Sequence, residues 1–204
     1  MPVELRVRPT KEQIAQLPPF VGLSLDRIHV VSTTSEFEAA HAAIRTERFI
    51  GFDTEAKPTF TSDAVRDGPH VIQFALRDRA FIVQLGARPP MAFLRSILES
   101  EEIVKVGFGL KSDRGPLLRK LGIRLGASVE LSQVLRRLRY KQALGVKAAV
   151  AVVLGQRLHK PKSVTTSNWA ASRLSPRQLL YAANDAYAAL TVFQAMGDQV
   201  WARG

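Results

Sequence analysis

The sequence has no cysteine among its 204 residues. Disulfide bonds, thiolate metal sites and cysteine nucleophiles are therefore excluded. Histidine is also scarce: the four histidines are scattered and show none of the helical spacing that zinc ligands use. A metal ion bound to this protein must therefore be held by oxygen atoms or by these isolated histidines, and a zinc site is not expected.

Long apolar segments are absent as well. No run approaches the roughly 18 apolar residues that a bilayer-spanning helix needs. The first 13 residues, MPVELRVRPTKEQ, lack the apolar region of a secretory signal peptide. We therefore expect a cytoplasmic protein with no membrane partner and no disulfide partner.

Acidic residues are few compared with basic ones. There are 18 aspartates and glutamates against 29 lysines and arginines, which gives a net charge of +11. Such an excess favours binding to polyanions, nucleic acid first and anionic membrane surfaces second, although it can also serve solubility alone. The densest basic stretch, residues 135–147, does not form one helical stripe and could equally be a solvated face.

The hydrophobic pattern predicts an α/β protein. With 46% hydrophobic residues the chain can bury one core, and we expect a lead-in segment at residues 1–26 followed by a single domain at residues 27–204. A short helix is expected near residues 10–17, and residues 155–171 are expected to form a loop. The expected strands cover residues 27–31, 48–55, 70–77, 80–85, 103–108 and 128–131. The expected helices cover residues 35–47, 90–100, 110–122, 131–139, 145–154 and 176–196. This order predicts a mixed sheet of five to six strands, containing one hairpin across residues 78–79 and flanked by helices.

The first motif that carries chemistry is 51-GFDTEAK-57. Asp53 and Glu55 are two residues apart at the end of a strand, so their side chains share a face. Two neighbouring carboxylates repel each other unless a cation lies between them, and Mg²⁺ or Mn²⁺ would suit such oxygen ligands. The alternative interpretation is a solvated strand end with two acids that have no role.

A second motif lies in residues 104–121, where a strand runs through a glycine turn into a helix that carries Asp113. One interpretation is an acid that only stabilises the helix N-terminus. Another is dinucleotide binding, because Gly107, Gly109 and Ser112 nearly match the glycine fingerprint and Glu130 follows about 20 residues on. Against this second interpretation, the third position is serine and the motif comes late in the chain.

The third motif is 181-YAANDAY-187 in the last predicted helix. Ser175 and Gln178 form a capping box at its start, with Pro176 at the first helical position. Tyr181 and Asp185 are four residues apart and lie on one helix face. Taken alone, they could also be a core-edge aromatic residue and an exposed acid.

Taken in order, the three motifs resemble those of the DEDDy family of exonucleases, over about residues 27–197. The stretch 167-SNW-169 and the pair Phe108-Gly109 are similar to the Werner-type branch of that family. Residue 180 is leucine where the histidine subfamily has an imidazole, so the tyrosine version of the third motif applies.

The resemblance implies an RNase H-like three-layer fold and a metal-dependent 3′-5′ exonuclease that releases 5′-nucleotides. Its cofactors would be two divalent ions, Mg²⁺ or Mn²⁺. In that family pattern Asp53 bridges both ions, Glu55 and Asp185 help hold the one that binds the attacking water, and Asp113 supports the second through water. The Tyr181 hydroxyl would orient the nucleophile.

The implied partners are nucleic-acid 3′ ends, single-stranded or recessed, with DNA favoured. An exoribonuclease acting on RNA 3′ ends or short oligoribonucleotides is the alternative, followed by a non-catalytic nucleic-acid-binding module. Lys57, Lys111 and Arg114 lie close to the motifs and could contact phosphate or be ordinary surface charges, and Trp169 could stack on a base or anchor the last helix. Because the sequence ends soon after that helix, we expect the grip on substrate to come from this domain or from a partner.

Overall fold

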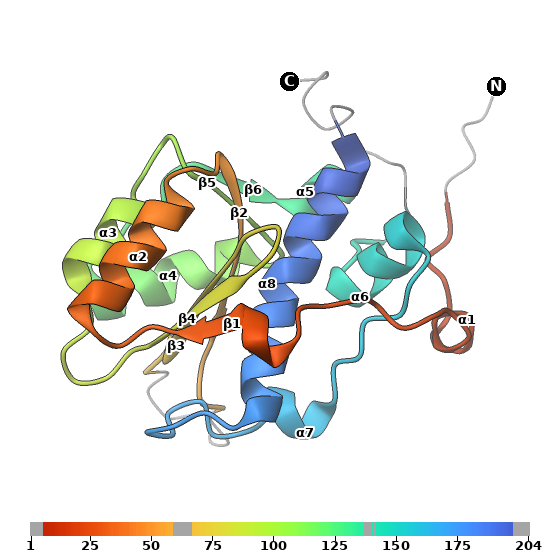
Figure 1. The fold of residues 1–204 in the computed structure, drawn as a ribbon. Coiled ribbons are helices and arrows are strands. Elements are labelled where there is room, and N and C mark those ends of the chain that lie inside the picture. Colours follow the sequence, from red (N-terminus) through yellow and green to blue (C-terminus); the bar gives the residue numbers. More distant parts are fainter. Residues whose placement is uncertain (1–5, 59–66, 137–139, 141, 198–204) are drawn as a thin grey trace.

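A computed structural model describes residues 6–58, 67–136, 140 and 142–197 of the chain. These residues form a six-stranded sheet with helices on both sides (Figure 1). The strands are β1 (Ile28–Val30), β2 (Phe49–Glu55), β3 (Val71–Ala75), β4 (Ala80–Gln84), β5 (Val104–Gly107) and β6 (Ser128–Glu130). The helices are α1 (Lys11–Ala15), α2 (Thr34–Ile44), α3 (Met91–Leu98), α4 (Leu110–Leu121), α5 (Leu131–Arg136), α6 (Val146–Ala149), α7 (Lys162–Thr165) and α8 (Pro176–Met196), with a 3₁₀ turn at Leu25–Arg27 and a π-helical turn at Val150–Leu154.

The sheet is mixed, as the sequence predicts. The spatial order is β1-β4-β3-β2-β5-β6. Strands β3 and β4 form the expected hairpin, and β2 runs antiparallel to β3, whereas the other neighbours are parallel. In this order β2 is a central strand, and its pairing with β3 places Asp53 directly opposite Gln73.

Alternating side chains of the central strands enter two different cores. Ile50 and Phe52 of β2 pack with residues of α2, α3 and α4. On the other face, Val71 and Ala75 of β3 pack with α8. Figure 1 shows α2 and α3 side by side, while α8 runs past the strands. The chain therefore has the predicted three layers, and the odd-numbered residues of β2, including Asp53 and Glu55, belong to the α8 face.

Helix α8 lies unusually close to β2. A Cβ atom on Gly51 would fall 2.1 Å from the carbonyl oxygen of Ala186. The α8 surface that faces the sheet is rich in buried alanines, which permit this approach. Since α8 carries Tyr181 and Asp185, this contact sets how near they come to the end of β2.

Several predicted boundaries differ from the structure. Helix α2 is capped by Thr33 in a capping box with Glu36, so it begins before Ser35. Residues 155–171, expected to be a loop, contain the short helix α7. Residues 137–139 and 141 of the basic stretch lie outside the described residues. Within the described parts, no helix has the length and apolar character that crossing a membrane requires.

Residues before the sheet are attached to the last helix and to the segment preceding α7. The Leu23 backbone N–H donates to Asn184 Oδ1 at 2.7 Å, and Asn184 Nδ2 donates to the Leu23 carbonyl at 3.2 Å. Arg157 donates to the Ala15 carbonyl at 2.6 Å. These bonds hold the N-terminal segment against the elements that surround the predicted site.

Candidate active site

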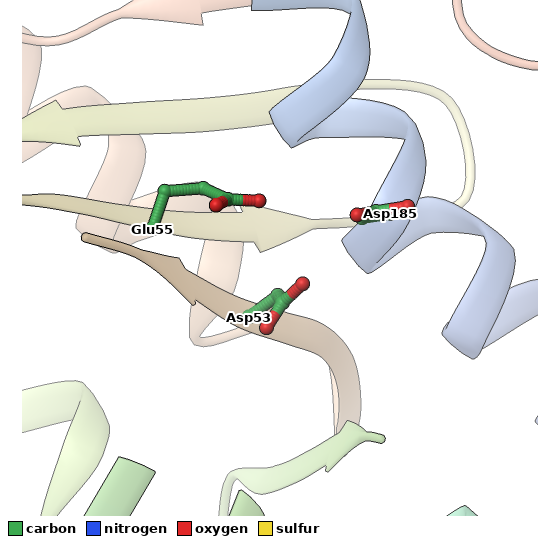
Figure 2. A group of neighbouring side chains, drawn as sticks. All are labelled: Asp53, Glu55 and Asp185. Carbon is green, nitrogen blue, oxygen red and sulfur yellow. The ribbon is translucent and has the colours of Figure 1, made fainter. Parts of the chain in front are cut away.

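Three of the predicted acidic residues meet where β2 approaches α8. Asp53 and Glu55 come from the end of β2, and Asp185 comes from the middle of α8. Each offers one carboxylate oxygen, and these three oxygens lie within 4.8 Å of one another (Figure 2). Strand periodicity brings the first two together, while the close packing of α8 brings the third from 130 positions further along the chain.

The electrostatics of this group favour a bound cation. Burial raises the pKa of Asp53, and the nearby carboxylates Asp185, Glu55 and Asp113 raise it further. Burial together with Asp185 raises the pKa of Glu55 to about 8. Clustered carboxylates of this kind remain ionised at neutral pH only when positive charge is supplied.

The fourth acid, Asp113, lies outside this close group. It sits in the first turn of α4 and accepts a hydrogen bond of 2.7 Å from the hydroxyl of Thr54. Thr54 is on the opposite face of β2 from Asp53, which explains the separation. Burial raises the pKa of Asp113 to about 6 despite the Thr54 bond.

A lysine that the sequence did not indicate completes the cluster. The Lys160 ammonium forms an ion pair with Oδ2 of Asp185, and the side chains are 21% and 3% exposed. Burial disfavours the ammonium, but Asp185, together with Tyr181 and Asp53, outweighs this effect and raises the Lys160 pKa. The residue lies in 159-HKPK-162, a short basic run with no local feature that distinguishes it from surface charge.

Tyr181 stands one helical turn before Asp185, as expected. Its hydroxyl is 2.8 Å from the hydroxyl of Thr165, and the Lys160 ammonium lies 5.1 Å from its ring centroid. Burial and the Asp185 carboxylate raise the pKa of Tyr181, so the phenol is neutral at pH 7. The phenol can therefore orient a ligand by hydrogen bonding, but it does not act as a base that takes a proton from the ligand. Trp169 is buried, packs on the Tyr181 ring and donates from Nε1 to the Thr165 carbonyl, so it anchors the last helix and cannot stack on a base.

A second buried polar residue, Gln73, also lies beside the acids. It is fully buried opposite Asp53, and neither polar atom of its side chain has a hydrogen-bond partner within the described residues. A buried amide without partners is destabilising, and such groups call for an explanation such as a bound water. Its position next to Asp53 was not predictable before the β2–β3 register was known.

The three basic residues predicted near the motifs have different surroundings. Lys57 and Lys111 are exposed. The Arg114 guanidinium donates to the Leu125 carbonyl at 3.0 Å and to Ser128 Oγ at 2.8 Å, so it connects α4 to the start of β6. Their contact with phosphate remains a prediction.

A basic cavity adjoins the acidic group on the Tyr181 side. Its volume is about 470 Å³. Its lining includes the basic side chains of Arg8, Lys147, Lys160 and Lys162, together with Thr165 and Tyr181. Positive charge from three separate segments therefore gathers beside the carboxylates, because only residues 160 and 162 are near one another in sequence.

The glycine turn before α4 has a structural explanation that does not involve a dinucleotide. A Cβ atom on Gly107 would lie 2.5 Å from the Phe52 carbonyl oxygen, so the residue permits close strand packing. Gly109 has a positive φ of 78° at the helix start. The Glu130 carboxylate accepts bonds from the Gly109 and Ser132 N–H groups, each at 3.1 Å, and is therefore already bound to this turn.

The donor set fits a divalent metal. Asp53, Glu55 and Asp185 present only oxygen ligands, which hard cations such as Mg²⁺ and Mn²⁺ prefer. Burial raises the pKa of all three acids, and the neighbouring carboxylates raise it further for Asp53 and Glu55.

Comparison with known proteins agrees with this geometry. The family model described as "3'-5' exonuclease" matches residues 28–201. The mouse bifunctional 3′-5′ exonuclease/ATP-dependent helicase WRN is 33% identical over an alignment of 153 residues that covers 73% of this chain and 11% of that protein. The human exonuclease mut-7 homolog is 27% identical over an alignment of 224 residues that covers 94% of this chain and 24% of that protein. This chain therefore spans only a small part of the length of either relative.

Solved structures share the fold. The Nibbler EXO domain of Aedes aegypti superimposes with a TM-score of 0.74 at 23% identity, covering 87% of this chain and 90% of that one. RNase D of Trypanosoma brucei gives a TM-score of 0.75 at 20% identity, covering 90% of this chain and 66% of that one. The three-layer arrangement is thus that of RNase D and related exonuclease domains.

Proposed function

Given that the chain belongs to the 3′-5′ exonuclease family, we propose that it hydrolyses terminal phosphodiesters of nucleic acid from the 3′ end, releasing 5′-nucleotides, with DNA as the favoured substrate. The observation that carries this proposal is the meeting of three carboxylate oxygens within 4.8 Å at the end of β2. The net charge of +11 supports a polyanionic substrate. A cytoplasmic location is part of the same proposal.

Asp53, Glu55 and Asp185 would hold the divalent ions, two Mg²⁺ or Mn²⁺, and Asp113 would support one of them through water. When bound, such ions lower the pKa of water and stabilise the negative charge that develops on the phosphate. The Asp113–Thr54 hydrogen bond keeps that carboxylate near β2 without placing it in the close group.

Tyr181 would position the attacking water. Its neutral phenol can donate one hydrogen bond and accept another, and Thr165 already occupies one side of the hydroxyl. The basic side chains around the neighbouring cavity would attract the strand by its phosphates. Lys57, Lys111 and Arg114 remain candidates for further phosphate contacts.

The reaction can be tested with end-labelled strands. A 5′-labelled DNA strand incubated with Mg²⁺ or Mn²⁺ should shorten stepwise from its 3′ end, and chelation should stop the reaction. RNA strands of the same lengths, run alongside, decide the substrate: faster cleavage of RNA would reassign the protein as an exoribonuclease. Shortening from the 5′ end, or cleavage without metal, would contradict the proposal.

Two carboxylate-to-amide variants test the assignment of residues. Asp53→Asn and Glu55→Gln should each slow cleavage at least about a thousandfold, the equivalent of roughly 4 kcal/mol of transition-state stabilisation. Binding of a labelled strand should persist. Glu101→Gln is the matched control because that acid is exposed on the turn before β5. Full activity of Asp53→Asn would show that the metal assignment is wrong.

A further inference from the structure

Lys160 already places a positive charge within the group of acids proposed to bind metal. Its ammonium is paired with Oδ2 of Asp185, whose side chain is only 3% exposed. Asp185 is also one of the three acids whose oxygens lie within 4.8 Å of one another. The ammonium therefore uses a carboxylate that a divalent ion would need.

The influence of this ammonium reaches the other two acids. Lys160 is the neighbouring group that opposes the raised pKa values of Asp53 and Glu55. Three partly or fully buried carboxylates so close together repel one another in an environment of reduced dielectric constant. Lys160 therefore supplies positive charge that compensates part of this repulsion.

A divalent ion and an ammonium cannot both lie against the same carboxylate without strong repulsion. The Lys160 side chain also lines the basic cavity beside Tyr181, so its ammonium can occupy a second position there. Its backbone can stay fixed: Lys147 Nζ donates to the Lys160 carbonyl at 3.2 Å, and the side chain of Leu158, two residues earlier, is 6% exposed. Rotation of the flexible four-carbon side chain is sufficient for the ammonium to move.

We propose that Lys160 occupies a cation position of the acidic group when metal is absent, and that a divalent ion binds at Asp185 by displacing this ammonium into the adjacent basic cavity. The inference rests on the proposed function, because it assumes that Asp185 is a metal ligand. The new element is that the Lys160 ammonium competes with the divalent ion for Asp185. The displaced ammonium would then join Arg8, Lys147 and Lys162 where phosphate is expected.

Metal affinity measured without substrate tests the competition. Mn²⁺ binding can be followed by electron paramagnetic resonance of the free ion for the wild type and for Lys160→Met. The variant should bind Mn²⁺ about tenfold more tightly, which corresponds to roughly 1.4 kcal/mol, and its metal-free form should melt at a lower temperature.

Lys162→Met is the matched control: it removes the same charge from the same cavity, but that lysine is exposed and has no ion pair with Asp185 within the described residues. Its affinity should stay within about twofold of the wild type. Equal or weaker Mn²⁺ binding by Lys160→Met would overturn the inference.

A second measurement uses the wild-type protein and does not depend on the variant folding. Lysines are acylated briefly with and without saturating Mn²⁺, and each site is quantified by mass spectrometry. Acylation of Lys160 should increase severalfold with Mn²⁺, because the ammonium leaves its buried partner, whereas Lys162 should be unchanged. Unchanged Lys160 labelling would overturn the inference.

The two assays also separate this inference from the proposed function. If the wild type binds no Mn²⁺ and Asp53→Asn makes no difference, the metal site itself is wrong and both proposals fail. If the wild type binds Mn²⁺ through Asp53 but Lys160 neither affects the affinity nor becomes more reactive, only the displacement fails.

Discussion

At the scale of single residues, the site is a group of acids whose pKa values are raised by their surroundings in the folded protein. Burial and mutual repulsion raise the pKa of Glu55 to about 8, from an ordinary 4.5, and burial raises the pKa of Asp113 to about 6, from 3.8. At a pH between the ordinary and the raised pKa of each acid, the folded protein therefore binds more protons at that acid than the unfolded chain does. The contribution of each acid to the free energy of unfolding is fully present below its ordinary pKa. It is lost as the pH rises through the raised pKa of the folded protein.

This sign gives a pH prediction for Glu55. The melting temperature of Glu55→Gln minus that of the wild type, both measured in chelator, should rise as the pH increases from about 5 to 8. Over this range the unfolded wild-type chain ionises Glu55 while the folded protein keeps it protonated, which destabilises the wild type, and the variant has no such group. The change should be a few degrees, about what 1 kcal/mol produces in a chain of this size. Differential scanning fluorimetry at several pH values measures it, with Glu101→Gln as the pH control. A difference that stays flat or falls would contradict the assignment of Glu55 as a raised acid.

Sequence motifs identify some of the residues of the site but not all of them. Asp53, Glu55 and Asp185 could each be singled out because strand period, helix spacing and the family motifs are local signals, and the packing of α8 on β2 then brings them together. Asp113 lies outside this close group, where it accepts a hydrogen bond from Thr54 on the other face of β2, and its support of a metal ion through water stays a prediction. Lys160 and Gln73 had no local signal, since their partners are residues 185 and 53, which lie on other elements of the chain.

At the scale of elements, the approach of α8 to β2 decides whether the site exists. Asp53 and Asp185 belong to different layers, and they meet because glycine at position 51 leaves room for the Ala186 carbonyl. The capping box Ser175–Gln178 then sets where α8 begins and hence which residues face the sheet. A small change at this contact should therefore affect both stability and metal binding.

Gly51→Ala tests this dependence. The added Cβ would lie 2.1 Å from the Ala186 oxygen, so α8 must shift away from β2. We expect a loss of about 1–3 kcal/mol in the free energy of unfolding, together with weaker Mn²⁺ binding. Gly86→Ala is the matched control, because a Cβ there meets nothing within 4 Å. Urea denaturation and Mn²⁺ titration measure both effects, and a Gly51→Ala protein as stable as the control would show that the close approach is not required.

Most elements were predictable, and the exceptions have physical reasons. The β3–β4 hairpin and the start of α8 follow from alternation and capping residues, which are local signals. Helix α7 was missed because its four residues are too few to show a helical period. The start of α2 was placed late because Ser35 and Thr33 are both good caps, and only Thr33 pairs with Glu36.

At the scale of the whole molecule, charge is separated into an acidic centre and a basic surround. The net charge is +11, yet the three acids that lie within 4.8 Å of one another form a partly buried group beside a cavity lined by Arg8, Lys147, Lys160 and Lys162. Such a pattern concentrates a polyanion near the site and releases its counterions on binding.

Binding should therefore depend steeply on salt. With Asp53→Asn, which is not expected to cut, the affinity for a labelled single strand should fall with a logarithmic slope of about −3, since each phosphate contact contributes roughly −0.7 and four basic residues line the cavity. Adding Lys162→Met should make the slope shallower by about 0.7. Arg119→Met, an exposed change on α4, should leave it unaltered. Fluorescence anisotropy from low to moderate salt measures these slopes, and equal slopes for all three proteins would refute the role of the cavity.

The sequence by itself determined the order of strands and helices, the pairing of acids within β2, the Tyr181–Asp185 face and the excess of positive charge, because each depends on neighbours within a few residues. The tertiary structure alone decided that Asp185 reaches β2, that Asp113 is held by Thr54 and that Lys160 enters the acidic group. These contacts join residues far apart in the chain, and their geometry depends on how closely α8 and the segment before α7 pack against the sheet, which no local pattern encodes.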